Sequence, residues 1–219
     1  MTDGILLIDK PTDMTSFGVV ARVRRVLSDQ KGKKMKVGHC GTLDPFATGL
    51  LILCVGKECK NAGSYTKLDK VYEATVRLGQ TSNTGDPEGE ISDVSNQQPS
   101  RDEVTNVLKN FVGDIKQTPP AHSAIKINGQ RAYNLARQGK EVEMPERTVT
   151  IHSLDIVEYQ YPELKIRTHV SSGTYIRSLA QDIGTALGTG AYCRELRRTK
   201  IADWDVQNAQ SLSSLGITD

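Results

Sequence analysis

Apolar residues recur along the chain with two different periods, and the periods separate predicted strands from predicted helices. Short apolar or alternating runs bounded by proline, glycine or asparagine are typical of strands. Strands are predicted for 4–9, 50–56, 71–79, 147–160, 164–171 and the stretch GAYCRELRRTKIADWDV that begins at 190. The run at 50–56 has the composition of a fully buried strand, whereas 71–79 alternates as a half-exposed one.

Helices are predicted where apolar residues return every three or four positions. One begins after Thr15 or Ser16, either of which can cap it, and buries its valines on one side. A second follows the capping box of Ser100 and Glu103 and runs through Val112 to Gly113. A third follows Gly173, and its apolar face comprises Ile176, Leu179, Ile183 and Leu187.

The order of these elements predicts an α+β fold with a mixed sheet. Strands and helices do not alternate as regular βαβ units, which argues against a doubly wound parallel sheet. The turn-rich stretch 80–90 is expected to be a mobile loop. Between 115 and 139 the pattern is strand, proline break, a strand turning at Asn128 and Gly129, and a short helix. With no repeat and no clear linker in 219 residues, we expect one domain.

Composition narrows the class of protein. Hydrophobic residues make up 37% of the chain and charged residues 25%, and no apolar run approaches the roughly 20 residues of a membrane span. The start, MTDGILLIDKP, lacks the features of a signal peptide, so a cytoplasmic protein is expected. The four cysteines form no CxxC pair, so we expect them to be reduced, buried fillers and expect no metal site.

Basic residues gather in two places although the net charge is only +2. One patch lies between Arg22 and Lys36, and the other comprises Arg194, Arg197, Arg198 and Lys200. Such patches suit a phosphate backbone that is held at defined points. The alternative is that each patch is ordinary solvated surface.

The stretch GHCGTLDPFATGLL places one acid, Asp44, among small and apolar residues. Glycines at 38, 41 and 49 allow unusual backbone angles and close approach around it. The structural alternative is a helix start, with Asp44 as N-cap and Pro45 in the first turn. In that case the acid would have no chemical role.

This stretch is similar to the catalytic motif of the tRNA pseudouridine synthases of the B type, which reads GHTGTLDPxATGLL. The resemblance extends to LLIDKP at 6–11, to DKVYEATVRLGQTSNTGDPEG at 69–89, to SSGTYIRSLAQDIG at 171–184 and to ELRR at 195–198. It thus covers nearly the whole chain. It implies the pseudouridine synthase fold, a mixed and mostly antiparallel central sheet flanked by helices and loops.

The resemblance also implies the chemistry. Asp44 would attack the target uridine, at the uracil ring or at the ribose carbon, and the base would be detached, turned over and rejoined through carbon. Arg177 would keep the buried acid ionised, and its replacement by alanine should reduce activity far more than folding. Tyr72 would stack on the flipped base. The alternatives are a surface arginine and a tyrosine at the edge of the core.

Further positions follow from the resemblance. His39 would fill the space that the extruded uridine leaves, and Tyr175 and Leu196 would line the uracil pocket. Each of these could instead be a structural residue. Lys10 and Pro11 would be scaffold packed against the active-site motif.

The insertion 118–147 would grip the T-stem-loop of tRNA, with phosphate contacts from Lys126, Arg131, Arg137 and Lys140. The resemblance implies that the reaction is the isomerisation of uridine 55 in the T-loop, which would need neither cofactor nor metal. No membrane and no protein partner are implied, and a monomer is expected.

The chain departs from the family pattern in three respects. Cys40 replaces a common threonine, which matters for oxidation if the thiol is exposed, and His122 replaces a tyrosine. The usual small C-terminal RNA-binding domain, of the PUA-like kind, is expected to be absent. Two rival functions stay open: an RNA-binding or tRNA-folding module that no longer catalyses, and a glycosidase, which would require a second paired acid.

Overall fold

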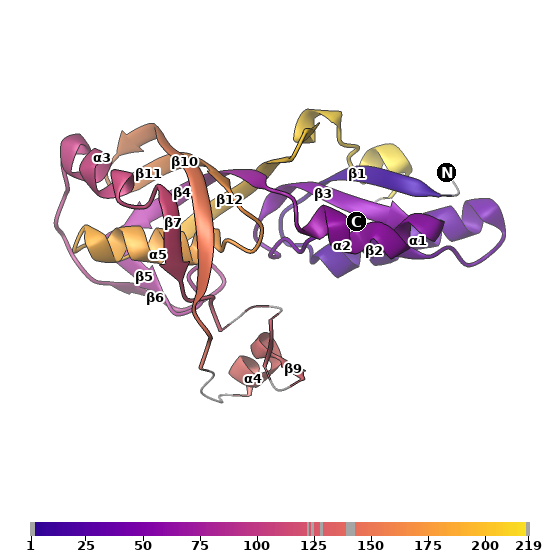
Figure 1. The fold of residues 1–219 in the computed structure, drawn as a ribbon, viewed down its shortest axis with the longest axis horizontal. Coiled ribbons are helices and arrows are strands. Elements are labelled where there is room, and N and C mark those ends of the chain that lie inside the picture. The colour runs from indigo at the N-terminus through magenta and orange to yellow at the C-terminus, as the bar shows by residue number, and fades with distance from the viewer. Residues whose placement is uncertain (1–2, 122, 124, 128, 139–142, 218–219) are drawn as a thin grey trace. The chain divides into compact units, whose positions relative to one another are not determined.

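The computed structural model describes residues 3–121, 123, 125–127, 129–138 and 143–217. Its central sheet is mixed and mostly antiparallel, and helices flank it, which confirms the predicted α+β class (Figure 1). The chain forms two compact units, residues 1–73 with 196–219 and residues 74–195. Strands β4 (Lys70–Leu78) and β12 (Ala191–Ile201) each carry residues of both units. The expectation of a single domain with an insertion stays a prediction.

The first unit is built around one central strand, β3. Its elements are β1 (Gly4–Lys10), α1 (Ser16–Lys31), β2 (Val37–His39), β3 (Thr48–Val55), the 3-10 helix η1 (Gly56–Asn61), α2 (Ala62–Thr66), β13 (Trp204–Asp205) and the 3-10 helices η2 (Val206–Asn208) and η3 (Ser213–Leu215). β1 and β2 pair with β3 in antiparallel fashion, and β12 pairs with it in parallel at Arg197 and Arg198. The short apolar run therefore predicted a buried strand correctly.

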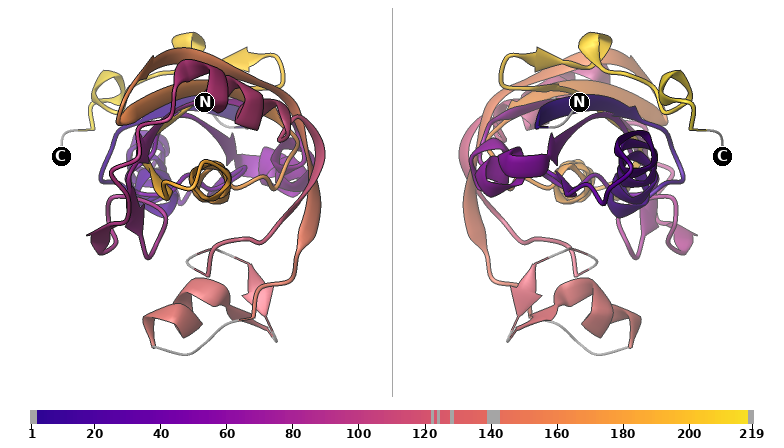
Figure 2. Two further views of the ribbon diagram at one scale, coloured as in Figure 1. Left: turned by 90° about the vertical axis from the view of Figure 1, so that its left-hand side faces the viewer. Right: turned by 90° about the vertical axis from the view of Figure 1, so that its right-hand side faces the viewer.

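Side chains of β3 alternate between two apolar layers. Leu51, Leu53 and Val55 pack against the buried face of α1, and Leu50, Ile52 and Cys54 pack against a layer that includes residues of η1 and α2. Figure 2 shows α1 and α2 on either side of these strands. Burial on both faces holds the strand rigidly, and the loop that leads into it carries Asp44.

The predicted capping of α1 is confirmed. Thr15 is the N-cap, and its Oγ1 accepts a hydrogen bond from the backbone N–H of Gly18 at 2.9 Å. Gly32 ends the helix with φ of 63°, in the left-handed region that glycine adopts readily. The other predicted cap, Ser16, is the first helical residue and bonds elsewhere.

The second unit continues the sheet in the order β4, β11, β10, β7. Its further elements are β5 (Gln80–Ser82), β6 (Ile91–Asp93), α3 (Arg101–Lys109), β7 (Gly113–Gln117), β8 (Lys126–Ile127), β9 (Gln130–Arg131), α4 (Ala132–Arg137), β10 (Arg147–Gln160), β11 (Glu163–Val170) and α5 (Ile176–Ala186). α5 lies close to the start of β12, because a Cβ at Gly184 would stand 2.3 Å from the backbone nitrogen of Ala191. Glycine is therefore required there.

Two expectations for this unit need correction. The capping box at Ser100 is present, but α3 ends at Lys109 and not at Val112, because the chain turns through Asn110 toward β7. The stretch 80–90 is not simply a loop: β5 pairs with β6, and Asp86 is buried within the turn between them.

Across the described residues, no helix is both long and apolar enough to cross a membrane.

Candidate active site

Asp44 lies in the loop between β2 and β3, and its side chain is half-buried. The alternative of a helix start at Asp44 is wrong. The backbone N–H of Ala47 donates to the carbonyl of Asp44 at 3.2 Å, which closes a turn with Pro45 at its second position, and β3 begins at Thr48. A turn and a helix start favour the same Asp-Pro pair, and the neighbouring strands decide between them.

Buried side chains from β1 and α1 hold this loop from one side. The Lys10 Nζ is fully buried and donates to the carbonyls of Pro11 at 2.7 Å, Met14 at 2.7 Å and Pro45 at 3.0 Å. Ser16 Oγ donates to the carbonyl of Leu43 at 2.9 Å and accepts from its N–H at 2.8 Å. The expected scaffold role of Lys10 is confirmed, since its ammonium bonds to the residue that follows Asp44.

Arg198 holds the loop from β12. Its side chain is only 1% exposed, and it donates to the carbonyls of Leu50 at 2.8 Å, Gly41 at 3.2 Å and Thr42 at 3.4 Å. Gly49 has φ of 103°, and a Cβ there would stand 2.3 Å from the Arg198 carbonyl oxygen. The glycine therefore permits the parallel pairing that brings Arg198 to the loop.

The second basic patch is thus not a free cationic surface. Arg198 is buried, Arg197 forms an ion pair with Asp9 at 2.7 Å, and Arg194 pairs with Glu163. Leu196 and Arg198 are both buried while Arg197 between them is half-buried, which is the alternation of a strand. This alternation is visible in the sequence, and it could have predicted that the Arg198 side chain is buried.

His39 and Cys40 precede the loop at the end of β2. His39 pairs with Leu53 in the ladder and is half-buried. Cys40 is fully buried, and burial raises the pKa of its thiol. The thiol therefore stays protonated beside the loop and is a poor nucleophile. All four cysteines are free; Cys40, Cys54 and Cys193 are buried as predicted, and Cys59 is half-buried.

Tyr72 and Leu196 belong to the same unit as Asp44. Tyr72 is on β4 and 8% exposed, and Leu196 is on β12 and 7% exposed. The nearby Lys70 donates its Nζ to the carbonyls of Leu68 and, at 2.6 Å, Thr66. Burial, and the charge of Arg198, lower the pKa of Lys70 to about 8.

Arg177 lies in the first turn of α5 in the second unit, and its side chain is 3% exposed. Its Nη1 donates to the carbonyl of Thr84 at 2.9 Å and to Asp86 Oδ2 at 3.0 Å. Asp86 also accepts from Thr84 Oγ1 and from the N–H of Glu88. The sequence analysis missed Asp86, because an Asp-Pro pair in a turn-rich stretch resembles any surface turn.

Tyr175 is fixed through its main chain. The buried Gln117 on β7 accepts from its N–H at 2.7 Å and donates to its carbonyl at 3.0 Å, and the Arg147 guanidinium lies 5.7 Å from its ring centroid. Gln117 therefore fixes the position of the Tyr175 main chain immediately before α5 begins. Nothing in the local sequence distinguishes this glutamine.

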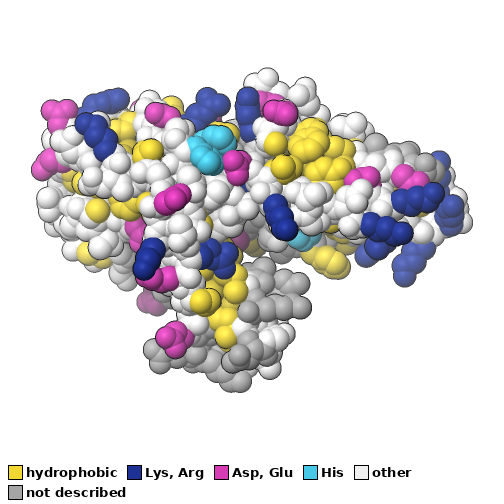
Figure 3. All heavy atoms as spheres, in the orientation of Figure 1, with side chains coloured by type: hydrophobic (Ala, Val, Ile, Leu, Met, Phe, Trp, Pro, Cys, Tyr) yellow, Lys and Arg dark blue, Asp and Glu magenta, His cyan; other side chains and the backbone are white. Residues whose placement is uncertain are grey.

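The remaining predicted contacts differ in how far the structure describes them. β8 and β9 form the predicted hairpin, but the side chains of Lys126, Arg131 and Arg137 lie outside the described part of the chain, as do His122 and Lys140. Between Arg22 and Lys36 the basic side chains are mostly exposed. Figure 3 shows them gathered over the region that Figure 1 labels α1.

The first unit thus carries Asp44, Tyr72, His39 and Leu196, and the second carries Arg177 and Tyr175. The meeting of Asp44 with Arg177 stays a prediction.

Comparisons with known proteins agree with one another. The sequence model described as "TruB family pseudouridylate synthase (N terminal domain)" matches residues 24–176, and that of the "tRNA pseudouridylate synthase B C-terminal domain" matches 177–216. A protein of Dechloromonas aromatica named tRNA pseudouridine synthase B is 46% identical over 217 residues, which cover 99% of this chain and 71% of that protein. One of Parabacteroides distasonis with the same name is 48% identical over 201 residues, covering 91% and 86%.

A solved structure shares the fold. In the crystal structure of a Cbf5–Nop10–Gar1 complex, one chain superimposes with a TM-score of 0.74 at 29% identity, over 96% of this chain and 52% of that one.

Proposed function

Because the chain belongs to the TruB family of pseudouridylate synthases, we propose that it isomerises uridine 55 in the T-loop of tRNA, with Asp44 as nucleophile and without a cofactor. The relatives above are named for tRNA, and a pseudouridine synthase is an isomerase. The non-catalytic RNA-binding module is the rival that the experiment below must separate.

The loop of Asp44 is the observation that carries the proposal. Its main chain is bonded on both sides of the acid, by Arg198 at Gly41 and Thr42 and by Lys10 at Pro45. Such bonding restricts the direction in which the carboxylate can point, which is what a nucleophile requires before its substrate arrives.

The reaction begins and ends with the same atoms. The Asp44 carboxylate attacks the uracil ring or the ribose carbon, and the bond between ribose C1′ and uracil N1 breaks. The base turns, C5 bonds to C1′, the bond between Asp44 and the substrate breaks, C5 loses its proton and N1 gains one. A carboxylate is a weak nucleophile in water but a better one in a site that excludes water.

Other residues bind and orient the uridine. Arg177 compensates the burial of the Asp44 charge, and Tyr72 stacks on the base, for which roughly 1–3 kcal/mol is typical. Tyr175 and Leu196 line the uracil pocket. His39 fills the space that the uridine leaves, which offsets part of the few kcal/mol lost in stacking and pairing. Lys126, Arg131 and the exposed cations of α1 contact phosphates.

The test is to incubate a tRNA transcript with wild type, Asp44→Asn and the matched control Asp29→Asn, and to map pseudouridine. Asp29 is an exposed acid on α1. Wild type and the control should give product at position 55, and Asp44→Asn should give none while binding the transcript normally. Equal product from all three proteins, or product only at another position, would overturn the proposal, and binding without product in wild type would favour the non-catalytic module.

A further inference from the structure

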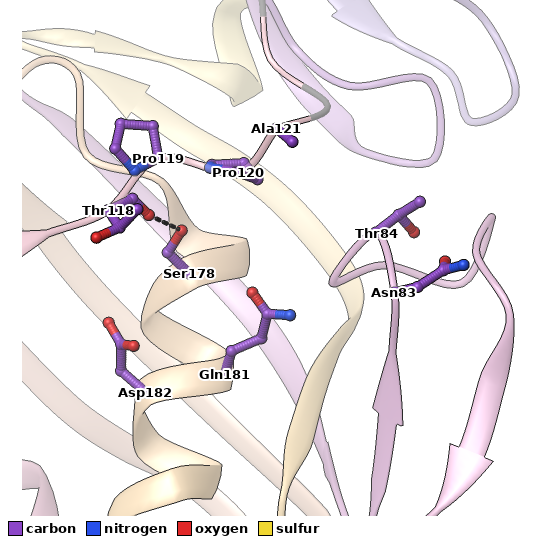
Figure 4. A pocket seen from close by; sticks show the side chains of 9 residues that line it. All are labelled: Asn83, Thr84, Thr118, Pro119, Pro120, Ala121, Ser178, Gln181 and Asp182. Atoms are coloured by element: carbon purple, nitrogen blue, oxygen red, sulfur yellow. Dashed lines mark hydrogen bonds between the residues drawn. The ribbon is translucent and has the colours of Figure 1, made fainter. Parts of the chain in front are cut away.

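A second site lies beside Arg177 within the second unit. An open pocket of about 320 Å³ is lined by α5, the segment 118–121 and the turn after β5 (Figure 4). Its polar residues include Ser178, Gln181, Asp182 and Thr84, and Pro119 and Pro120 supply an apolar wall. This volume lies at the small end of the range for ligand sites.

Each polar group on α5 offers an acceptor to the pocket. Ser178 Oγ gives its proton to the carbonyl of Thr118 at 2.9 Å, so its oxygen can only accept from a ligand. Gln181 Nε2 donates to the carbonyl of Ser82 at 3.5 Å, so this side chain offers its amide oxygen as an acceptor and keeps a second N–H donor. Ser178 and Asp182 therefore suit a ligand that brings N–H or O–H donors.

Asp182 is the strongest of these acceptors. Its carboxylate is half-buried and makes no hydrogen bond or ion pair with any residue that the structure describes, and burial raises its pKa. Figure 4 shows it projecting from α5 toward the 118–121 segment. A carboxylate withdrawn from water without a donor is costly, so a ligand donor is the natural partner.

We propose that this pocket binds a guanine base of the RNA substrate, with the Asp182 carboxylate accepting hydrogen bonds from guanine N1–H and N2–H. The inference rests on the proposed function and names a feature of its substrate. Asp182 is then a specificity-determining residue for the nucleotide that accompanies the target uridine.

Geometry favours guanine over the other bases. Its Watson–Crick edge carries two adjacent N–H donors that match the two oxygens of a carboxylate, whereas uracil offers a single N–H. The proline wall suits the face of an unstacked base. Asp182 is five residues beyond Arg177 on the same helix, about 7.5 Å along its axis, so a nucleotide near the target in the same strand can reach it.

The experiment exploits inosine, which lacks the guanine N2 amino group. T-stem-loops are prepared in which each loop position other than the target carries guanosine or inosine in turn, and kcat and KM are measured for wild type and Asp182→Ala. At one position inosine should raise KM by roughly tenfold for wild type, the effect of losing one charge-assisted hydrogen bond. For Asp182→Ala the KM values of the two RNAs should differ by less than about twofold, because no carboxylate accepts a hydrogen bond from the amino group.

Thr185→Ala is the matched control. Thr185 is exposed on α5 outside the pocket lining, so this variant should keep the wild-type preference. If Asp182→Ala does not fold, Asp182→Asn takes its place, with a reduced preference expected. The inference is overturned if wild type treats guanosine and inosine alike at every position, or if the Asp182 variant discriminates as wild type does.

Binding separates this inference from the proposed function. Dissociation constants of the same RNA pairs with Asp44→Asn report the pocket without requiring turnover. If Asp44→Asn binds the guanosine RNA more tightly than the inosine RNA, the pocket is supported even when wild type makes no pseudouridine. If Asp44→Asn binds both RNAs equally, the pocket is overturned even when wild type makes pseudouridine.

Discussion

Each of the two units buries cations at its part of the candidate site, but the units pair those cations with different partners. In the first unit Lys10 and Arg198 donate to main-chain carbonyls on both sides of Asp44. In the second, Arg177 donates to a carboxylate, Asp86, as well as to a carbonyl. The first arrangement fixes the path of a loop, and the second fixes a charged side chain.

The difference has a consequence for mutagenesis. A buried ion pair can be removed as a pair, and replacing both partners by neutral groups of similar shape is often close to neutral for stability. Main-chain carbonyls cannot be removed by substitution. If a cation that donates to them is lost, no second substitution can therefore remove the groups left without a donor. The two kinds of buried cation should therefore respond differently to double substitution.

The largest expected effect is at Arg177. Because Asp86 would be left charged and buried, Arg177→Met should lower the free energy of unfolding by about 3–5 kcal/mol, more than the sequence alone suggested. Adding Asp86→Asn should recover most of that stability, since asparagine keeps an acceptor for Thr84 Oγ1 and the N–H of Glu88. Activity should stay reduced by roughly 10³-fold in both variants.

Urea denaturation and pseudouridine formation measure the two effects separately. Asp86→Asn alone is the control, and it should retain more activity than either variant that lacks the arginine. Wild-type turnover by the double variant would refute the role of Arg177, and unrecovered stability would refute the ion-pair account.

A smaller effect is expected at Lys10. Lys10→Met keeps the length of the side chain but leaves the carbonyls of Pro11, Met14 and Pro45 without their donor, so it should destabilise by about 2–4 kcal/mol. Lys60→Met, at an exposed position of η1, should change stability by less than about 0.5 kcal/mol. Comparable unfolding midpoints for the two variants would show that the ammonium does not hold the loop.

The smallest effect concerns pH and another buried cation, Lys70. Its folded-state pKa of about 8 lies below the ordinary 10.5, so the unfolded chain binds more protons between these values. The free energy of unfolding of wild type should therefore rise from pH 8 to 10.5 relative to that of Lys70→Met, by on the order of 1–2 kcal/mol.

Denaturation of both proteins at pH 7 and 10.5 checks the sign, because other groups titrate alike in the two. A difference that stays constant with pH would mean that Lys70 keeps its charge through its bonds to the carbonyls of Thr66 and Leu68.

Elements with strong local signals could be predicted from sequence. Thr15 and Gly32 bound α1, and Ser100 with Glu103 starts α3, because caps act within a few residues. Asp44 shows the limit of such reasoning. Asp-Pro favours both a helix start and a turn, and the turn prevails because β3 must begin at Thr48 to enter the sheet.

Motifs and periodicity are local properties, and they were enough to indicate the family, the α+β class, the positions of the main elements and a set of candidate site residues. Packing was needed to show that Arg198 is buried scaffold, that Asp86 is the partner of Arg177 and that Asp182 faces a pocket. The hydrogen-bond partners of Arg177 and Arg198 lie roughly 90 to 160 positions away along the chain. The residues that line the pocket together with Asp182 come partly from a separate segment. Burial and pairing over such separations depend on how strands and helices pack, which no local pattern encodes.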